Sequence, residues 1–173
     1  MADIEQQPRQ DLNGAAAGKK IHEIAKDARM CMFATDVTNF PGDVRPMAIQ
    51  KVDEDGTFWF LSSSASEKNR DIAKDPRVIV TCQNDDKYEY LAVSGTATVH
   101  TDRATFDKYW TALASAWFDG KDDPRVTVLR VTPNAGHYWQ TTSGKIVSFV
   151  KMSFAAVTGS KTSDGGVDGE LNV

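Results

Sequence analysis

The chain has 173 residues, 40% of them hydrophobic, with a formal net charge of −4 at pH 7 and a pI near 5.3. This length fits one domain, and the apolar content is well above that of a disordered chain. Lys and Arg are scattered among Asp and Glu, which argues against a nucleic-acid partner. No segment approaches the roughly 20 apolar residues of a membrane span, and the start lacks the apolar core of a secretory signal. We therefore expect a cytoplasmic protein without a membrane partner.

The N-terminal third of the chain begins with a polar stretch, residues 1–14, that shows no periodicity and is expected to be a flexible arm. Over residues 15–29 apolar side chains recur at helical spacing, which predicts an amphipathic helix. Cys31 and Cys82 each stand among apolar residues without CxxC spacing, which indicates reduced core cysteines.

The middle of the chain alternates in the manner of β-strands. Runs at 30–37 and 44–52 flank turn-forming residues and predict a hairpin, and a further turn leads into an aromatic strand at 57–61. Short connections of this kind predict an antiparallel three-stranded meander. A serine cluster and a helix over 67–75 follow, the helix ending before a proline.

Further strands are expected at 77–83 and 88–100, with Gly95 marking a bulge or a close backbone approach. Asp102 can cap a helix over 103–118. Runs at 125–131 and 135–141 predict a final strand pair.

The C-terminal part is expected to contain a closing helix over 143–158. The Gly-rich, acidic residues 160–173 are expected to be a disordered tail, which leaves 15–159 as the folded domain. About six or seven antiparallel strands with a few helices favour an α+β domain whose sheet closes on itself, because closure removes exposed edges.

One stretch, residues 58–71, combines a strand, a serine-rich turn and a helix start that carries Lys68. Free backbone N–H groups, serine hydroxyls and an ammonium can together bind a phosphate. The alternative is a capping box in which Ser64 and Glu67 satisfy the helix start by themselves. Arg45 on the second strand could reach the same anion or could face solvent, and Pro46 favours an edge strand or a bulge.

The remaining side chains with chemical potential are aromatic or histidine. Tyr138 and Trp139 at the end of the last strand could cover a flat ligand or could pack in the core. His22, His100 and His137 fall in different elements, so neither a catalytic triad nor a metal site is predicted. A phosphate site with aromatic walls but no reactive side chains indicates a bound cofactor.

Four segments in one order carry a family resemblance: RPMAIQ, FWFLSSSASEKNRDIAKDPRV, YLAVSG and WFDGKDDPRVTVLRVTPNAGHYW. Over about residues 16–159 the chain resembles the pyridoxamine 5'-phosphate oxidase-like FMN-binding split-barrel family, and within it the general stress protein 26 group. The resemblance implies an α+β antiparallel split β-barrel with flanking helices.

The resemblance also implies a flavin site at a homodimer interface, occupied by FMN or by FAD. Arg45 and Lys68 would hold the phosphate, the backbone near Pro46 would run beside the isoalloxazine, and Trp139 and Tyr90 would contact a flavin held by the other subunit. The full implied set is Arg45, Pro46, Met47, Ala48, Ile49, Gln50, Leu61, Ser62, Ser63, Lys68, Tyr90 and Trp139.

Two departures from the family pattern limit the expected activity. The authentic oxidase has a basic residue where this chain has Glu67, and its late Arg-x-His motif would fall at Lys145 and Val147, where the histidine is missing. We therefore expect a flavin-dependent oxidoreductase of unknown substrate, not an authentic pyridoxamine 5'-phosphate oxidase. The alternatives are a non-catalytic flavin-binding stress protein acting as a sensor, carrier or store, and a haem protein with His137 as axial ligand.

Overall fold

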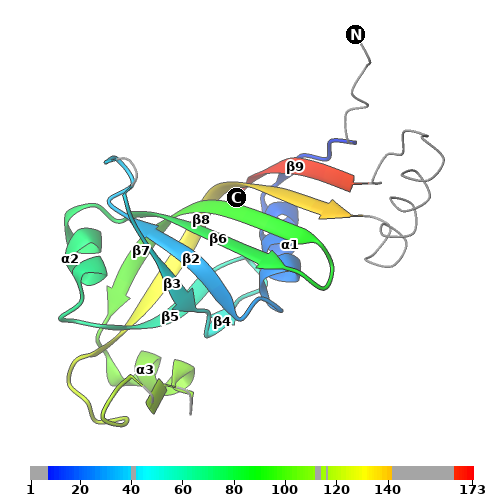
Figure 1. Ribbon diagram of the computed structural model, residues 1–173. Coiled ribbons are helices and arrows are strands. Elements are labelled where there is room, and N and C mark those ends of the chain that lie inside the picture. The colour runs from blue at the N-terminus through cyan, green and yellow to red at the C-terminus, as the bar shows by residue number, and fades with distance from the viewer. Residues whose placement is uncertain (1–7, 40–41, 112–113, 116, 142–165) are drawn as a thin grey trace, which may run out of the picture.

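The computed structural model describes residues 8–39, 42–111, 114–115, 117–141 and 166–173 (Figure 1). The elements are β1 (Leu12–Asn13), α1 (Ala15–Ala25), β2 (Met30–Thr35), β3 (Asp43–Ala48), β4 (Lys51–Val52), β5 (Phe58–Ser63), α2 (Glu67–Lys74), β6 (Arg77–Asn84), β7 (Glu89–His100), α3 (Arg103–Tyr109), β8 (Val126–Thr141) and β9 (Gly166–Asn172). The predicted closing helix over 143–158 lies outside the described residues. No helix in the described part of the chain is long and apolar enough to span a membrane.

A single curved sheet dominates the fold. Its strands follow the order β1-β9-β8-β7-β6-β2-β3, and β5 pairs with both β8 and β4. All of these pairs are antiparallel except β1 with β9. Among the described residues no ladder joins β3 to β5, so the barrel stays open between them. The fold is therefore the expected α+β split β-barrel with flanking helices.

The barrel interior is filled by alternate residues of the strands, as the period of two requires. Phe33, Phe58 and Phe60 are fully buried, and the rings of Phe33 and Phe60 meet edge to face at 5.2 Å. Ile21 and Ile24 of helix α1 pack in the same hydrophobic core as these rings. The helix predicted over 15–29 is thus confirmed, although it ends at Ala25.

The predicted meander is only partly correct. The hairpin of β2 and β3 is confirmed, with Phe33 opposite Arg45. The third strand does not join it, because the run predicted at 44–52 breaks after Ala48 and resumes as β4, which pairs with β5. Strand β5 then pairs with β8, which is much later in the chain.

The predicted final strand pair is one long strand, β8. Its first part, Val126–Val131, pairs with β5, and its last part, Ala135–Thr141, pairs with β9, while β7 pairs with β8 from Val128 to Gln140. Pro133 lies between the two parts, opposite Gly95, where the register with β7 shifts. A Cβ on Gly95 would lie 2.7 Å from the Thr132 carbonyl oxygen, so the expected bulge and close approach are confirmed.

The expected helix over 103–118 ends at Tyr109. Asp102 caps it as predicted, accepting a hydrogen bond of 2.8 Å from the Thr105 N–H. Trp110 is already extended, with φ −66° and ψ 129°, so it does not continue the helix. Trp117, within the range expected to be helical, is 68% exposed.

The two ends of the chain are also more ordered than the sequence predicted. Within the expected flexible arm and disordered tail, the described strands β1 and β9 pair with each other, and β9 adds to the edge of β8 (Figure 1). Leu171 is fully buried in the core, which the Gly-rich composition concealed. Gly169 permits this packing, because a Cβ there would collide with the backbone of Gln10.

Candidate functional site

The predicted phosphate-binding cations come from two elements that the fold brings together. Arg45 on β3 donates a hydrogen bond of 2.7 Å to the Thr35 hydroxyl and lies 3.9 Å from an Asp71 oxygen. Lys68 in the first turn of α2 is partly buried. Burial lowers the pKa of Lys68, and the positive charge of Arg45 lowers it further. The fold thus brings Lys68 close enough to Arg45 for the two positive charges to act on each other.

The charge balance at this pair leaves Lys68 uncompensated. Asp71 lies near Arg45 and accepts a hydrogen bond of 2.8 Å from Thr35, and Asp43 lies 3.8 Å from Arg45. Within the described residues no carboxylate forms an ion pair with the Lys68 ammonium. An anion arriving here would therefore meet charge that the protein itself does not neutralise.

The helix start beside Lys68 differs from the predicted capping box. Ser66, not Ser64, is the N-cap, and its hydroxyl accepts from the Asn69 N–H at 3.4 Å. Ser64 has another role in the turn: the Ser64 N–H donates a hydrogen bond to the Arg125 carbonyl. Glu67 is the first helical residue and is exposed, so it does not serve as the partner of a Ser64 cap.

The two serines of the predicted phosphate site are engaged within the protein. Ser62 is 2% exposed and donates a hydrogen bond of 2.7 Å to the Asn69 side chain, which in turn donates to Thr127. The Ser63 hydroxyl accepts from the Ala65 N–H at 3.3 Å. These hydroxyls therefore fix the turn. The N–H groups of Ser64, Ala65 and Ser66 also donate within the protein, so the two cations are the main groups that could attract an anion.

The run Arg45 to Gln50 lies partly on the edge strand β3, as Pro46 predicted. Met47 is buried with its side chain in the core, whereas Pro46 and Ala48 are exposed on the opposite face. Ile49 packs against the core, and the Gln50 side chain accepts from the Thr111 hydroxyl at 3.1 Å. The side chains of β3 thus alternate between the inner face of the barrel and its outer face.

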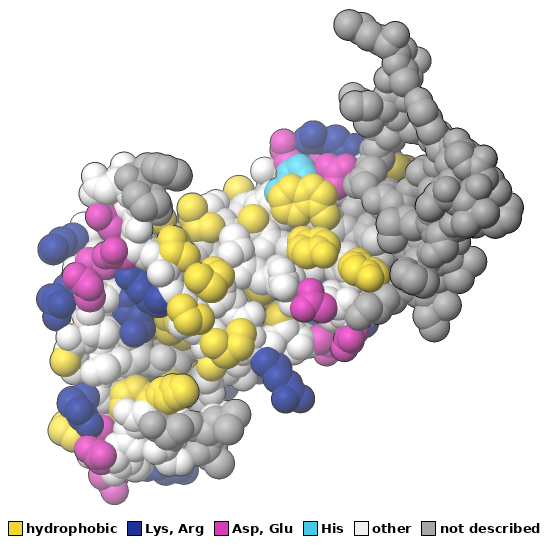
Figure 2. All heavy atoms as spheres, viewed as in Figure 1, with side chains coloured by type: hydrophobic (Ala, Val, Ile, Leu, Met, Phe, Trp, Pro, Cys, Tyr) yellow, Lys and Arg dark blue, Asp and Glu magenta, His cyan; other side chains and the backbone are white. Residues whose placement is uncertain are grey.

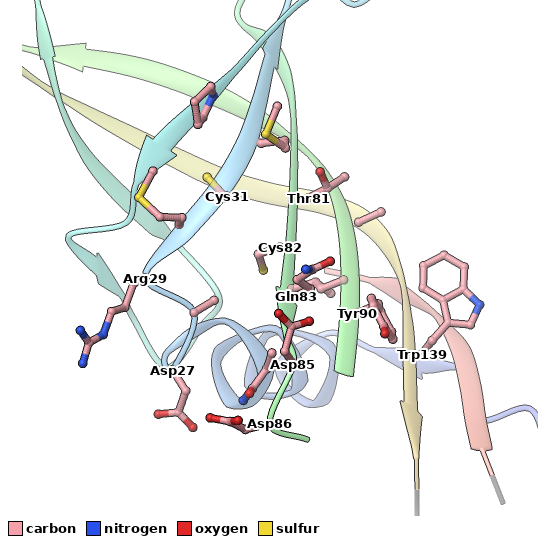
Figure 3. Close-up of a pocket in the computed structure, with 17 residues that line it drawn as sticks. Asp27, Arg29, Cys31, Thr81, Cys82, Gln83, Asp85, Asp86, Tyr90 and Trp139 are labelled. Carbon is pink, nitrogen blue, oxygen red and sulfur yellow. The ribbon is translucent and has the colours of Figure 1, made fainter. Parts of the chain in front are cut away.

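A cleft of about 840 Å³ opens beside β2, on the side where Pro46 emerges. Tyr90 and Trp139 lie on one side of it and Asp27 and Arg29 on the other (Figure 3). It begins where the β2–β6 ladder ends at Met32 and Thr81. The lining residues are Asp27, Ala28, Arg29, Met30, Cys31, Met32, Pro46, Thr81, Cys82, Gln83, Asn84, Asp85, Asp86, Tyr90, Leu91, Ala92 and Trp139.

The cleft gathers only some of the predicted residues. Pro46, Tyr90 and Trp139 line it, whereas Arg45 and Lys68 do not. Leu61 points away from it and packs under α3. Sequence reasoning missed Thr35 and Asp71, which hold Arg45; the only signal was a threonine ending an apolar strand and an acid one helical turn beyond Lys68.

The chemical groups in the cleft are weakly reactive. Cys31 and Cys82 are free and buried, as predicted, and burial raises the pKa of each thiol to about 12. Both thiols therefore remain protonated at neutral pH. Asp27 pairs with Lys87 at 2.9 Å. In the described part of the chain no three His, Cys, Asp or Glu side chains gather as a metal site would require.

His137 has a local partner outside the cleft. Its Nε2 lies 3.0 Å from an Asp168 oxygen on β9, and its ring centroid lies 4.5 Å from that of Trp139. Tyr138, the other aromatic residue of this strand end, is buried and donates to the Gln10 carbonyl at 2.8 Å. Of Tyr138 and Trp139, only Trp139 is placed to cover a ligand.

Comparison with known proteins gives consistent results. The sequence pattern of the family described as pyridoxamine 5'-phosphate oxidase like matches residues 16–164. General stress protein 26 of Bacillus subtilis is 30% identical over 80 residues, 44% of this chain and 57% of that protein. The chain spans about 60% of the length of the curated relatives it matches.

Two solved structures are similar over more of the chain. A putative general stress protein 26 from Jannaschia sp. CCS1 is 27% identical, with a TM-score of 0.74, and the match covers 92% of this chain and 99% of that one. The general stress FMN/FAD binding protein of Xanthomonas citri is 26% identical, with a TM-score of 0.61, covering 72% and 88%. Fold, residue pattern and relatives agree, and the chain belongs to the pyridoxamine 5'-phosphate oxidase-like family.

Proposed function

We propose that the protein binds FMN, or FAD, with the flavin phosphate on Arg45 and Lys68 and the isoalloxazine at the cleft. The observation that carries this proposal is the adjacency of the two cations, in which the charge of Arg45 lowers the pKa of Lys68 while no described carboxylate pairs with Lys68. Two like charges held together are relieved by an anion with several oxygens. The Xanthomonas citri relative named for FMN/FAD binding supports the same ligand.

The path from the phosphate to the ring runs along β3. Arg45 and Pro46 are consecutive, and their side chains alternate between the inner face and the cleft. A flavin on this strand would have its phosphate at the α2 end and its flat ring against apolar and aromatic side chains. Tyr90 and Trp139, 41% and 42% exposed, offer surfaces that such a ring can cover.

We further propose that the cleft is completed by a second copy of the chain. Large apolar side chains are exposed on this face, and Figure 2 shows yellow side chains over the middle of the molecule. Met30 and Met32 on β2 are 52% and 44% exposed, and Val44 on β3 is 50% exposed. An apolar patch beside a cleft is typical of a surface that another protein covers. The expected homodimer would thus bury the flavin between subunits.

A bound flavin would supply electron or hydride transfer, and the residues of this chain would bind, orient and cover it. We assign the protein as a flavin-dependent oxidoreductase of unknown substrate. One observation favours the non-catalytic alternative of a sensor, carrier or store: the described lining residues include no histidine, and both thiols have a pKa of about 12. Cytoplasmic location remains a prediction from the sequence.

The test is the absorption spectrum of the purified protein before and after FMN is added, with gel filtration of the same sample. We expect flavin bands to co-elute with a dimer. Loss of a hydrogen-bonded charge typically costs about 1.5–3 kcal/mol, so Lys68→Ala should weaken FMN binding about ten- to 100-fold. Lys74→Ala, an exposed lysine on the same helix, is the matched control and should bind normally.

Two outcomes would count against this assignment. A colourless protein that does not bind saturating FMN would remove the flavin site altogether. A holo-protein that fails to oxidise NADH or NADPH, and does not reduce artificial acceptors, would retain the site but favour the non-catalytic alternative.

A further inference from the structure

A row of four side chains crosses the outer face of the sheet beneath α3. Lys51 of β4 is opposite Trp59 of β5, Trp59 is opposite Arg130 of β8, and Arg130 is opposite Thr98 of β7. Directly opposed residues of antiparallel strands project to the same face, so the four side chains stand together. We call Trp59, Arg130 and Thr98, with Tyr109 and Lys108 of α3, the outer basic-aromatic cluster.

Aromatic rings hold this cluster together. The rings of Tyr109 and Trp59 are stacked, with centroids 4.2 Å apart and planes 16° from parallel. The Arg130 guanidinium lies 5.8 Å from the Trp59 centroid. The Lys108 ammonium lies 5.1 Å from the Tyr109 centroid and 5.9 Å from that of Trp59. Trp59 therefore makes a favourable cation–π contact with each of the two cations.

Carboxylates do not neutralise these two cations. Among the described residues, neither Arg130 nor Lys108 forms an ion pair. Their neighbour Lys51 differs, since it pairs with Asp53, which also accepts from the Trp59 indole N–H at 2.6 Å. Asp53 is thus engaged with Lys51 and Trp59, and the charge of Lys108 interacts with it without forming an ion pair.

Two donors in the cluster are buried and unsatisfied. Tyr109 is 4% exposed, and its hydroxyl has no hydrogen-bond partner among the described residues; the same holds for the buried Nε of Arg130. A buried polar group without a partner destabilises the folded protein. The exposed Thr98 hydroxyl lies at the end of the row, 3.1 Å from His100 Nε2. Guanidinium, ammonium and hydroxyl groups here can all donate hydrogen bonds.

We propose that the outer basic-aromatic cluster binds the phosphate group of a small ligand. A fork of guanidinium N–H groups, an ammonium and hydroxyls approaching from different elements suit a tetrahedral oxyanion better than a planar one. The site differs from the proposed flavin site, because none of its members lines the cleft and, in the described part of the chain, none forms a hydrogen bond or ion pair with Arg45 or Lys68. In Figure 1, α3 lies beside β5, away from β9 and α1.

The test must separate this site from Lys68, which would also attract phosphate. Inorganic phosphate is titrated by calorimetry into the full-length protein and into Lys68→Ala, with chloride at matched ionic strength as the reference. We expect both proteins to bind phosphate. Arg130→Met in the Lys68→Ala background should weaken binding at least tenfold, and Lys108→Met should weaken it by a smaller factor.

Three further variants keep the result interpretable if Arg130→Met perturbs the fold. Tyr109→Phe retains the stacked ring and removes only the hydroxyl, so it should weaken phosphate binding several-fold at unchanged melting temperature. Arg130→Lys should recover part of the affinity. Arg77→Met, at an exposed arginine on β6 that pairs with Asp75, should bind like its parent.

The outcomes are decisive in both directions. Tighter binding of phenyl phosphate than of inorganic phosphate would support the site and assign it to phosphorylated small molecules, and equal affinity would assign it to free phosphate. Absence of phosphate binding in Lys68→Ala, or equal binding by Arg130→Met and its parent, would overturn the proposal. Neither of these results would affect the flavin assignment, which rests on FMN binding.

Discussion

Two pairs of cations lie on opposite sides of this sheet, and they are held by different interactions. Arg45 is fixed by a hydrogen bond to Thr35 and has Asp71 at 3.9 Å, whereas Arg130 is packed against the Trp59 ring without a carboxylate partner. The first pair depends on directional polar contacts and the second on stacked rings. One sheet can therefore concentrate positive charge by two means, which single substitutions can separate.

The largest effect is expected on flavin binding at the first pair. Arg45→Met should weaken FMN binding about ten- to 100-fold, because a hydrogen bond to a charged group is worth about 1.5–3 kcal/mol. Arg130→Met should leave FMN affinity within about twofold, since Arg130 lies outside the cleft. Quenching of FMN fluorescence on binding measures both constants. Equal losses in the two variants would mean that the two cation pairs are not separate sites.

The second expected effect is on stability at the second pair. Trp59→Ala should lower the free energy of unfolding by about 2–3 kcal/mol, because it removes a partly buried ring and its stacking on Tyr109. Trp117→Ala is the control: its side chain is 68% exposed, and the expected cost is below about 1 kcal/mol. Urea unfolding followed by circular dichroism measures both. A comparable loss in both variants would show that the Trp59–Tyr109 stack contributes little.

The sequence was sufficient to predict the local parts of both regions. Period-two alternation placed β2, β3, β6 and β7, and Asp102 and Gly95 were assigned their capping and close-approach roles correctly. These features depend on neighbours in the chain, so local patterns are enough to identify them. The family resemblance added the split barrel, which periodicity alone left as a sheet that closes.

The parts that could not be predicted depend on contacts between distant residues. The partners of Arg45 are Thr35 and Asp71, and the row from Trp59 to Arg130 exists only because β5 pairs with β8 instead of extending the meander. Strand order over such separations is not encoded in a short window. The C-terminal strand was missed for a similar reason, since Leu171 finds its buried place only beside β8.

The smallest predicted effect concerns the pH dependence of stability at the first pair. Burial and Arg45 lower the pKa of Lys68 in the folded protein below its usual 10.5. Between the lowered pKa of the folded protein and the usual 10.5, the unfolded chain binds more protons than the folded chain. The free energy of unfolding should therefore rise with pH over this range. Below the lowered pKa, the charged Lys68 destabilises the folded protein to its full extent. Lys68→Met should therefore slightly stabilise the flavin-free protein near neutral pH and flatten the rise toward about pH 10.

Lys51 supplies the control of opposite sign for this experiment. The hydrogen bond that Lys51 donates to Asp53 raises the pKa of Lys51, so its contribution is present below the usual 10.5 and is lost as pH rises through the raised value. Lys51→Met should accordingly lower stability at neutral pH, by little because the pair is exposed. Urea denaturation of both flavin-free variants from about pH 7 to about pH 10 distinguishes the signs. If Lys68→Met lowered stability as Lys51→Met does, the charge of Lys68 would already be compensated in the folded chain. The repulsion between Lys68 and Arg45 would then give no reason to expect phosphate binding at this pair.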